Sequence, residues 1–242
     1  GLLCLVYIWK AVPELRMKRE DWHFNKDIAA KQISVGIPMG LQYSITAIGT
    51  MMVQSSLNIL GSYAVAAFTA GNKIECIFTQ AFVAIGTTIS TYNAQNIGAG
   101  KLDRVRQGFR ATDVIGCAYA VIAGFILFFA GKYFSYLFIS DNADVVIPMV
   151  DTYLRCVGMF LVPLYVVNCY RNGFQGMGYG LLPMLSGVAE LVGRGVMAVI
   201  AANKKSYTMA CMASPFAWVV ATVLLIVLYF YVMKDMKKKL CL

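Results

Sequence analysis

Charged residues are scarce in this chain, and histidine is nearly absent. Only 14% of the 242 residues are charged, and His23 is the single histidine, whereas a soluble domain has about 25% charged residues. Hydrophobic residues make up 59% of the chain, and the mean hydropathy is +0.66. This composition excludes an ordinary soluble globular domain and predicts an integral membrane protein.

The motifs of metal and hydrolytic chemistry are also missing. The sequence has no C-x-x-C, H-E-x-x-H or G-x-S-x-G, and one histidine in a charged stretch cannot build a metal site. Gly98-Ala-Gly-Lys101 lacks the upstream glycine and the following Ser or Thr that a phosphate-binding loop requires. The seven cysteines are best interpreted as small apolar side chains. We therefore expect no enzyme, no metal and no cofactor beyond a coupling ion.

Lysine and arginine lie between the apolar runs rather than on one basic face with interleaved aromatics. The net charge of +9 is therefore interpreted as a topology signal, which predicts a lipid bilayer and not a nucleic acid as the partner. Six spans are expected, at about residues 33–60, 64–96, 108–131, 145–170, 181–202 and 207–233.

The remaining segments complete this predicted organisation. We expect residues 1–9 to be the end of a preceding transmembrane helix, 10–31 a charged cytoplasmic connector, 32–233 a six-helix lobe and 234–242 a basic cytoplasmic tail. When Arg171 and also Arg110, at the start of the third span, are counted with the connectors, 15 Lys and Arg residues fall on one side of the membrane and 3 on the other. That asymmetry predicts a multi-pass protein with both ends of the chain in the cytoplasm.

The first predicted span has many uncharged polar side chains. Such groups do not all face lipid, so several are expected to line the bundle interior or a water-filled cavity. The cavity-lining candidates are Gln42, Thr46, Thr50, Gln54 and Asn58.

Five ionisable residues lie deep inside the predicted spans, about 15 to 20 Å from the helix entries at ~1.5 Å per residue. Asp151 with Arg155 and Glu190 with Arg194 have i, i+4 spacing, with the acid first. This order favours ion pairing on a helix. Both acids are candidates for a coupling-ion or proton site, with the arginines as charge partners, but simple mutual neutralisation explains the spacing equally well.

Glu75 is the fifth of these residues and has no partner at helical spacing. Lys73 is two positions away, about 200° around the helix. Two interpretations stay open. Glu75 is either a proton- or cation-sensitive site that faces a central cavity, or a hydrogen-bonded structural residue that anchors its helix to the polar first span.

Three short motifs mark the helix ends and hinges. Ile37-Pro38 opens the first span, and Gln95-Asn-Ile-Gly-Ala-Gly-Lys101 with Arg104 follows the second. Gly173-Phe-Gln-Gly-Met-Gly178 with Pro183 follows the fourth, where the glycines of the stretch 171–180 predict an irregular hinge. Over about residues 28–235 the chain resembles the C-terminal half of the multidrug and toxic compound extrusion (MATE) transporters. The most specific part of that resemblance is the loop with Asn96, Gly98, Gly100, Lys101 and Arg104.

The resemblance implies one lobe of a 12-helix antiporter that has two six-helix lobes. Such an antiporter would expel organic cations or other amphipathic compounds across the cell (plasma) membrane in exchange for Na⁺ or H⁺, together with a missing N-terminal lobe. Some Na⁺-coupled members have a carboxylate on the first helix of this half, where this chain has Thr46. This difference shifts the expected ion site to Glu75 or to an acid in the other half. The alternatives are a lipid-linked saccharide flippase of the same superfamily and a non-transporting membrane scaffold.

Overall fold

The structure, a computed structural model, describes residues 2–12, 23–139 and 142–240. The chain divides into two units, Gly1–Ser34 and Val35–Leu242. The first unit contains α1 (Leu2–Ala11) and the first turns of α2 (Lys26–Leu60). The side chain of Asn25 caps α2, because its Oδ1 accepts the backbone N–H groups of Asp27 and Ile28 at 3.0 and 3.2 Å. Most of the predicted connector, residues 13–22, lies outside the described residues, as do residues 1, 241 and 242 of the predicted end segments.

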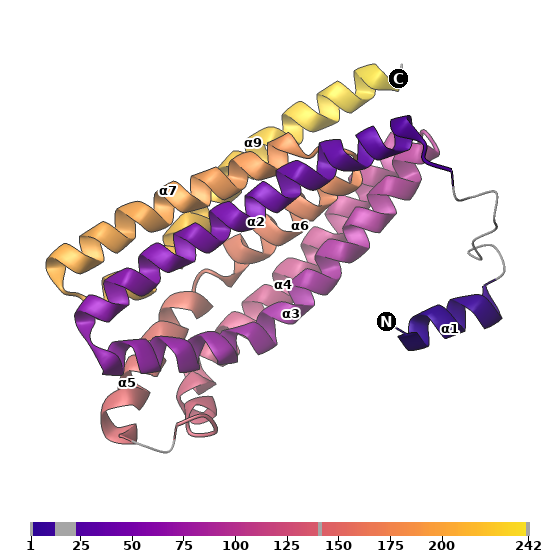
Figure 1. The fold of residues 1–242 in the computed structure, drawn as a ribbon. Coiled ribbons are helices and arrows are strands. Elements are labelled where there is room, and N and C mark those ends of the chain that lie inside the picture. Colours follow the sequence, from indigo (N-terminus) through magenta and orange to yellow (C-terminus); the bar gives the residue numbers. More distant parts are fainter. Residues whose placement is uncertain (1, 13–22, 140–141, 241–242) are drawn as a thin grey trace. The chain divides into compact units, whose positions relative to one another are not determined.

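The second unit is a helical bundle, and its described residues form no strand (Figure 1). Its helices after α2 are α3 (Ser62–Gly98), α4 (Leu102–Ser135), α5 (Ala143–Gly158), α6 (Leu161–Gly176), α7 (Leu181–Lys204), α8 (Tyr207–Cys211) and α9 (Ala213–Lys239). α3 packs against α4, α5 and α6, and α7 packs along α9. The buried core includes large side chains from several helices, among them Phe82, Phe109, Tyr153, Tyr165 and Phe174.

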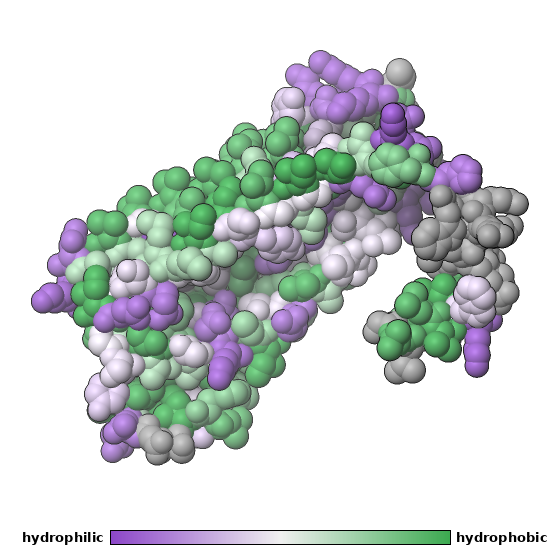
Figure 2. Space-filling view, viewed as in Figure 1, coloured by the Kyte–Doolittle hydropathy of each residue, from purple (hydrophilic) through white to green (hydrophobic). Residues whose placement is uncertain are grey.

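Most of these helices are long and apolar enough to cross a bilayer. Among the described residues, four helical segments meet that condition, and a fifth does so if α5 and α6 form one bent span. α2 is 35 residues long but is less apolar, because of the polar side chains noted above. The chain is therefore an all-α membrane protein, as its composition predicted, with a broad band of apolar side chains on the surface (Figure 2).

The main break in the bundle is between α5 and α6, whose axes differ by 54°. The sequence predicted one span at 145–170 and a hinge at 171–180. The position of the hinge was wrong, because α6 stays helical to Gly176, and the bend falls within the predicted span, which α5 and α6 can still form together. Pro163 explains the position of the break, since its ring disfavours the helix before it and it has no N–H to donate. The Pro163 carbonyl accepts the Thr222 hydroxyl of α9 at 3.0 Å.

Small residues bring α6 very close to α3. A Cβ added to Gly176 would lie 2.1 Å from the backbone oxygen of Ser90, and one added to Gly86 would lie 2.8 Å from the amide nitrogen of Asn172. Since no larger side chain fits at these contacts, the two helices stay in register, and the polar face of α6 lies beside α3.

Candidate functional site

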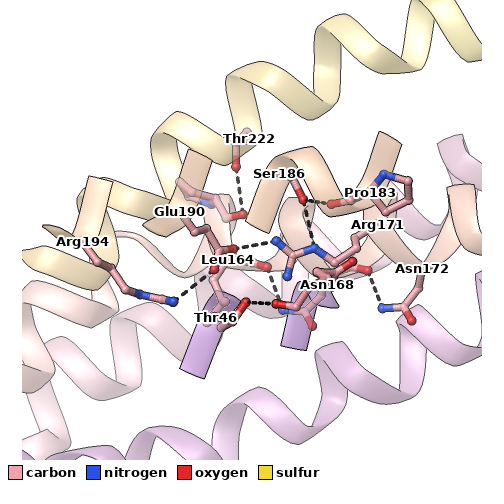
Figure 3. A network of polar contacts seen from close by, with 12 residues as sticks. Thr46, Leu164, Asn168, Arg171, Asn172, Pro183, Ser186, Glu190, Arg194 and Thr222 are labelled. Carbon is pink, nitrogen blue, oxygen red and sulfur yellow. Dashed lines mark hydrogen bonds and ion pairs between the residues drawn. The ribbon is translucent and has the colours of Figure 1, made fainter. Parts of the chain in front are cut away.

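A buried ion cluster joins α6 to α7 (Figure 3). Glu190 Oε1 accepts Arg171 Nη2 at 2.9 Å, and Glu190 Oε2 accepts Arg194 Nη2 at 3.2 Å. Arg171 Nε also donates to the hydroxyl of Ser186 at 3.0 Å. The side chains of Arg171, Glu190 and Arg194 are only 13%, 3% and 6% exposed. Both carboxylate oxygens of Glu190 are therefore occupied by guanidinium groups inside the bundle.

Arg171 is the member of this cluster that the sequence analysis missed. The sequence placed it in the connector after the fourth predicted span, and that placement was wrong, because α6 extends past it and its guanidinium is ion-paired in the interior. The sequence does contain a pattern that would have predicted this position. An i, i+3, i+4, i+7 spacing places four polar residues on one face of a helix, namely Asn168, Arg171, Asn172 and Gln175.

The polar residues predicted on the first span divide into two groups. Gln42 is buried, its Oε1 accepts Gln175 Nε2 at 3.2 Å, and its backbone oxygen accepts the Thr46 hydroxyl at 3.0 Å. Thr50 and Asn58 are exposed, and half-buried Gln54 donates to Asn58 at 3.3 Å. Only Gln42 and Thr46 therefore contact the interior polar network.

Glu75 is buried on α3 and accepts a short hydrogen bond from the hydroxyl of Tyr153 on α5. Asn72, one turn before it, donates to the same hydroxyl at 3.4 Å. Arg194 is close enough to interact electrostatically with Glu75, although in the described part of the chain no cation lies within salt-bridge distance of this carboxylate. The structure therefore brings Glu75 near the α6–α7 cluster as a separate, hydrogen-bonded acid.

Asp151 and Arg155 form their ion pair at 2.9 Å on α5, with side chains 18% and 51% exposed. The Arg155 guanidinium also lies over the ring of Phe128 at 5.4 Å. Phe128 is four residues, or about 6 Å, from Lys132 near the end of α4. The contact with Phe128 places Arg155 beside the C-terminal third of α4.

The glycine-containing loop after the second predicted span is a tight turn between α3 and α4. Gly100 has φ +70°, which glycine adopts without strain. The backbone oxygen of Asn96 accepts the N–H of Lys101 at 2.8 Å, and the oxygen of Lys101 accepts the N–H of Arg104 at 3.2 Å. Gly98, the last residue of α3, has open space around its Cα. The motif reverses the chain at one end of the bundle.

A second polar contact fixes the turn between α6 and α7. The Tyr179 hydroxyl donates a short hydrogen bond to Asp235 near the end of α9, and Lys239 pairs with Asp235 at 2.7 Å and lies over the Tyr179 ring at 4.8 Å. Burial raises the pKa of Tyr179 to about 12, so its phenol stays protonated and remains a donor at neutral pH.

An all-helical membrane lobe with paired ionisable groups in its interior is typical of polytopic membrane transport proteins. The chain belongs to the MatE family, whose model matches residues 38–200. Two curated relatives come from Bacillus subtilis (strain 168). The probable multidrug resistance protein YpnP is 29% identical over 153 residues, which cover 63% of this chain and 34% of YpnP. The probable multidrug resistance protein YoeA is 27% identical over 112 residues, which cover 45% of this chain and 24% of YoeA.

Solved structures show the same fold. The outward-facing conformation of a multidrug resistance MATE family transporter superposes with a TM-score of 0.87 at 18% identity, over 97% of this chain and 53% of that one. A MOP superfamily transporter from Pyrococcus furiosus has a TM-score of 0.87 at 19% identity, over 97% of this chain and 54% of that one. The chain therefore spans about half the length of these transporters, which confirms the resemblance and the lobe architecture.

Proposed function

We propose that this chain forms one lobe of a secondary active antiporter that exports amphipathic compounds, organic cations included, in exchange for Na⁺ or H⁺. A second six-helix lobe, the plasma membrane and a cytoplasmic location of both chain ends are parts of the same proposal. The observation that supports it best is the buried set of Glu75, Arg171, Glu190 and Arg194 under a polar face of the lobe. Charges inside a membrane are expensive and mark ion or substrate pathways.

The polar face continues along α3. Exposed uncharged polar side chains recur on it at intervals of about one or two helical turns, at Asn72, Gln80, Thr87, Thr91 and Gln95. A hollow of about 440 Å³ lies over the last part of this stripe, lined by Thr87, Thr88, Thr91, Tyr92 and Gln95. Because hydrocarbon does not satisfy such groups, we expect the stripe to face water or the second lobe. A surface of this kind provides a route for substrates between two lobes.

Glu75 is the proposed coupling site of this lobe. It differs from Glu190, whose two oxygens both contact arginines, because within the described residues the Glu75 carboxylate makes no ion pair and accepts the hydroxyl of a neutral phenol, Tyr153. A carboxylate in that position can exchange a proton or a cation without breaking an ion pair. Asp151 and Glu190 are weaker candidates, because each is already neutralised by an arginine.

The test is ethidium efflux by the complete transporter in everted vesicles, with the Na⁺ and pH gradients varied separately. We expect Glu75→Gln to bind ethidium but to lose gradient-driven efflux. Asp113→Asn is a matched control, because Asp113 is a carboxylate on α4 that also accepts a tyrosine hydroxyl, from Tyr170 at 2.9 Å. Full coupled efflux by Glu75→Gln, or loss only in Asp113→Asn, would contradict the assignment.

The two alternatives are less well supported. A flippase for a lipid-linked pyrophosphate needs several unpaired cavity arginines, whereas Arg155, Arg171 and Arg194 are each ion-paired to an acid. A non-transporting scaffold does not need ionisable groups in its interior. Such groups destabilise a protein in lipid, so their presence argues against this alternative.

A further inference from the structure

The α6–α7 cluster holds two guanidinium groups and one carboxylate, and all three side chains are at least 87% buried. The carboxylate of Glu75 also interacts electrostatically with Arg194, so these four groups are balanced in charge. Their hydrogen bonds are not complete, and a buried ion needs a full set of partners.

Arg194 is the group that lacks hydrogen-bond acceptors. Its Nη2 forms an ion pair with Glu190, but its Nε and Nη1 are buried and have no hydrogen-bond partner in the described chain. A buried donor without an acceptor is destabilising, and a charged donor more so. Among the described residues Glu75 does not supply the acceptor, because its carboxylate accepts the Tyr153 hydroxyl and is not in ion-pair contact with Arg194.

The unused donors of Arg194 face α2 where that helix has no side chain. A Cβ added to Gly49 would lie 3.1 Å from Arg194 Cδ and 3.5 Å from Nη1. Within the described residues, α2 packs less extensively against the other helices than α7 packs along α9. A small group can therefore reach Arg194 by a modest displacement of α2 at Gly49.

We propose that Arg194 binds the carboxylate of an amphipathic substrate, so that the transporter favours amphiphiles with an acidic group over matched compounds without one. This inference rests on the proposed transport function and specifies its substrate class. A guanidinium group is the preferred protein partner of a carboxylate, because its planar N–H donors match the carboxylate oxygens. The two donors of Arg194 that have no partner in the described residues, Nε and Nη1, are enough for one carboxylate.

The test uses two rhodamine dyes that differ in one group, rhodamine B with its free carboxylate and rhodamine B ethyl ester. Binding to the purified complete transporter is measured by fluorescence anisotropy, and efflux is measured in vesicles. We expect Arg194→Gln to weaken binding of the acid by about 10- to 100-fold, the effect of losing a charged hydrogen bond, and to change ester binding less than about 2-fold. Arg194→Lys should recover part of the affinity for the acid. Arg155→Gln, the arginine of the other i, i+4 pair, should leave both dyes unaffected.

Gly49→Ala is a second variant that keeps every charge. The added methyl group would contact Arg194 and narrow the approach along α2, so the acid should bind more weakly and the ester should not. This variant decides the question if Arg194→Gln does not fold. Equal losses for the two dyes, or wild-type binding of the acid no tighter than of the ester, would overturn the inference. If neither dye is transported but Arg194-dependent binding of the acid persists, the transport proposal fails and the carboxylate site stands.

Discussion

The Glu190 cluster allows a quantitative prediction about stability. Glu190→Gln keeps the size of the side chain but leaves Arg171 and Arg194 without their shared carboxylate, at contacts of 2.9 and 3.2 Å. Removing one partner of a buried ion pair costs about 3–5 kcal/mol. Because this single substitution leaves two cations without a carboxylate, we expect the free energy of unfolding to fall by at least about 3–5 kcal/mol.

The matched control is Asp151→Asn in the other i, i+4 pair. Arg155 is half exposed, so its charge can reach the headgroup region when the acid is removed. Exposed ion pairs of this kind contribute about 0–1 kcal/mol to the free energy of unfolding. The two substitutions have the same chemistry and spacing and differ mainly in burial.

The assay is unfolding of the complete protein in mixed micelles by increasing SDS, followed by tryptophan fluorescence. The reasoning is refuted if Glu190→Gln loses no more stability than Asp151→Asn. Simultaneous replacement of Arg171, Glu190 and Arg194 by methionine or leucine should restore most of the loss, since apolar replacement of a whole buried ion group is often neutral or stabilising. A triple variant as unstable as Glu190→Gln would show that the charges themselves are not the source of the cost.

Three further predictions concern packing and hydrogen bonds. Gly176→Ala should destabilise the bundle by about 1–3 kcal/mol, because the added methyl group would lie 2.1 Å from the α3 backbone. Gly40→Ala is its control. Nothing lies within 4 Å of a Cβ added there, so this variant should be neutral or slightly stabilising in the same unfolding assay. Tyr153→Phe should cost about 1–3 kcal/mol, because it leaves the buried carboxylate of Glu75 without its donor, and an unchanged unfolding curve would contradict that contact. Tyr179→Phe should change global stability by only about 0.5–1.5 kcal/mol but should speed proteolysis between α6 and α7, since it removes the link to α9; equal cleavage rates in variant and wild type would argue against the link.

Composition and motifs were enough to predict the class and the family. A 14% charged content cannot support a soluble domain of this size, and apolar runs separated by basic segments specify membrane helices. The i, i+4 pairs were also predictable, because the spacing of Glu190 and Arg194 brings the side chains together on any helix, and the structure shows the contact at 3.2 Å. These properties are local, so they do not depend on which helices become neighbours.

The partners of the buried charges depend on the tertiary fold. The contact of Arg171 with Glu190 joins residues of two helices. The contact of Glu75 with Tyr153 joins residues that are 78 positions apart in the sequence. The helical periodicity of the sequence therefore predicts neither contact. The break between α5 and α6 was likewise missed, because a proline is tolerated inside a membrane helix only where neighbouring helices satisfy the backbone around it, and here the Thr222 hydroxyl donates to the Pro163 carbonyl. The sequence thus determined that this chain is a membrane lobe of the MatE family. The packing of α2, α3 and α6 against α7 decided which charges meet and left Arg194 with unused donors, because hydrogen bonds in lipid are set by the residues that face one another across helices.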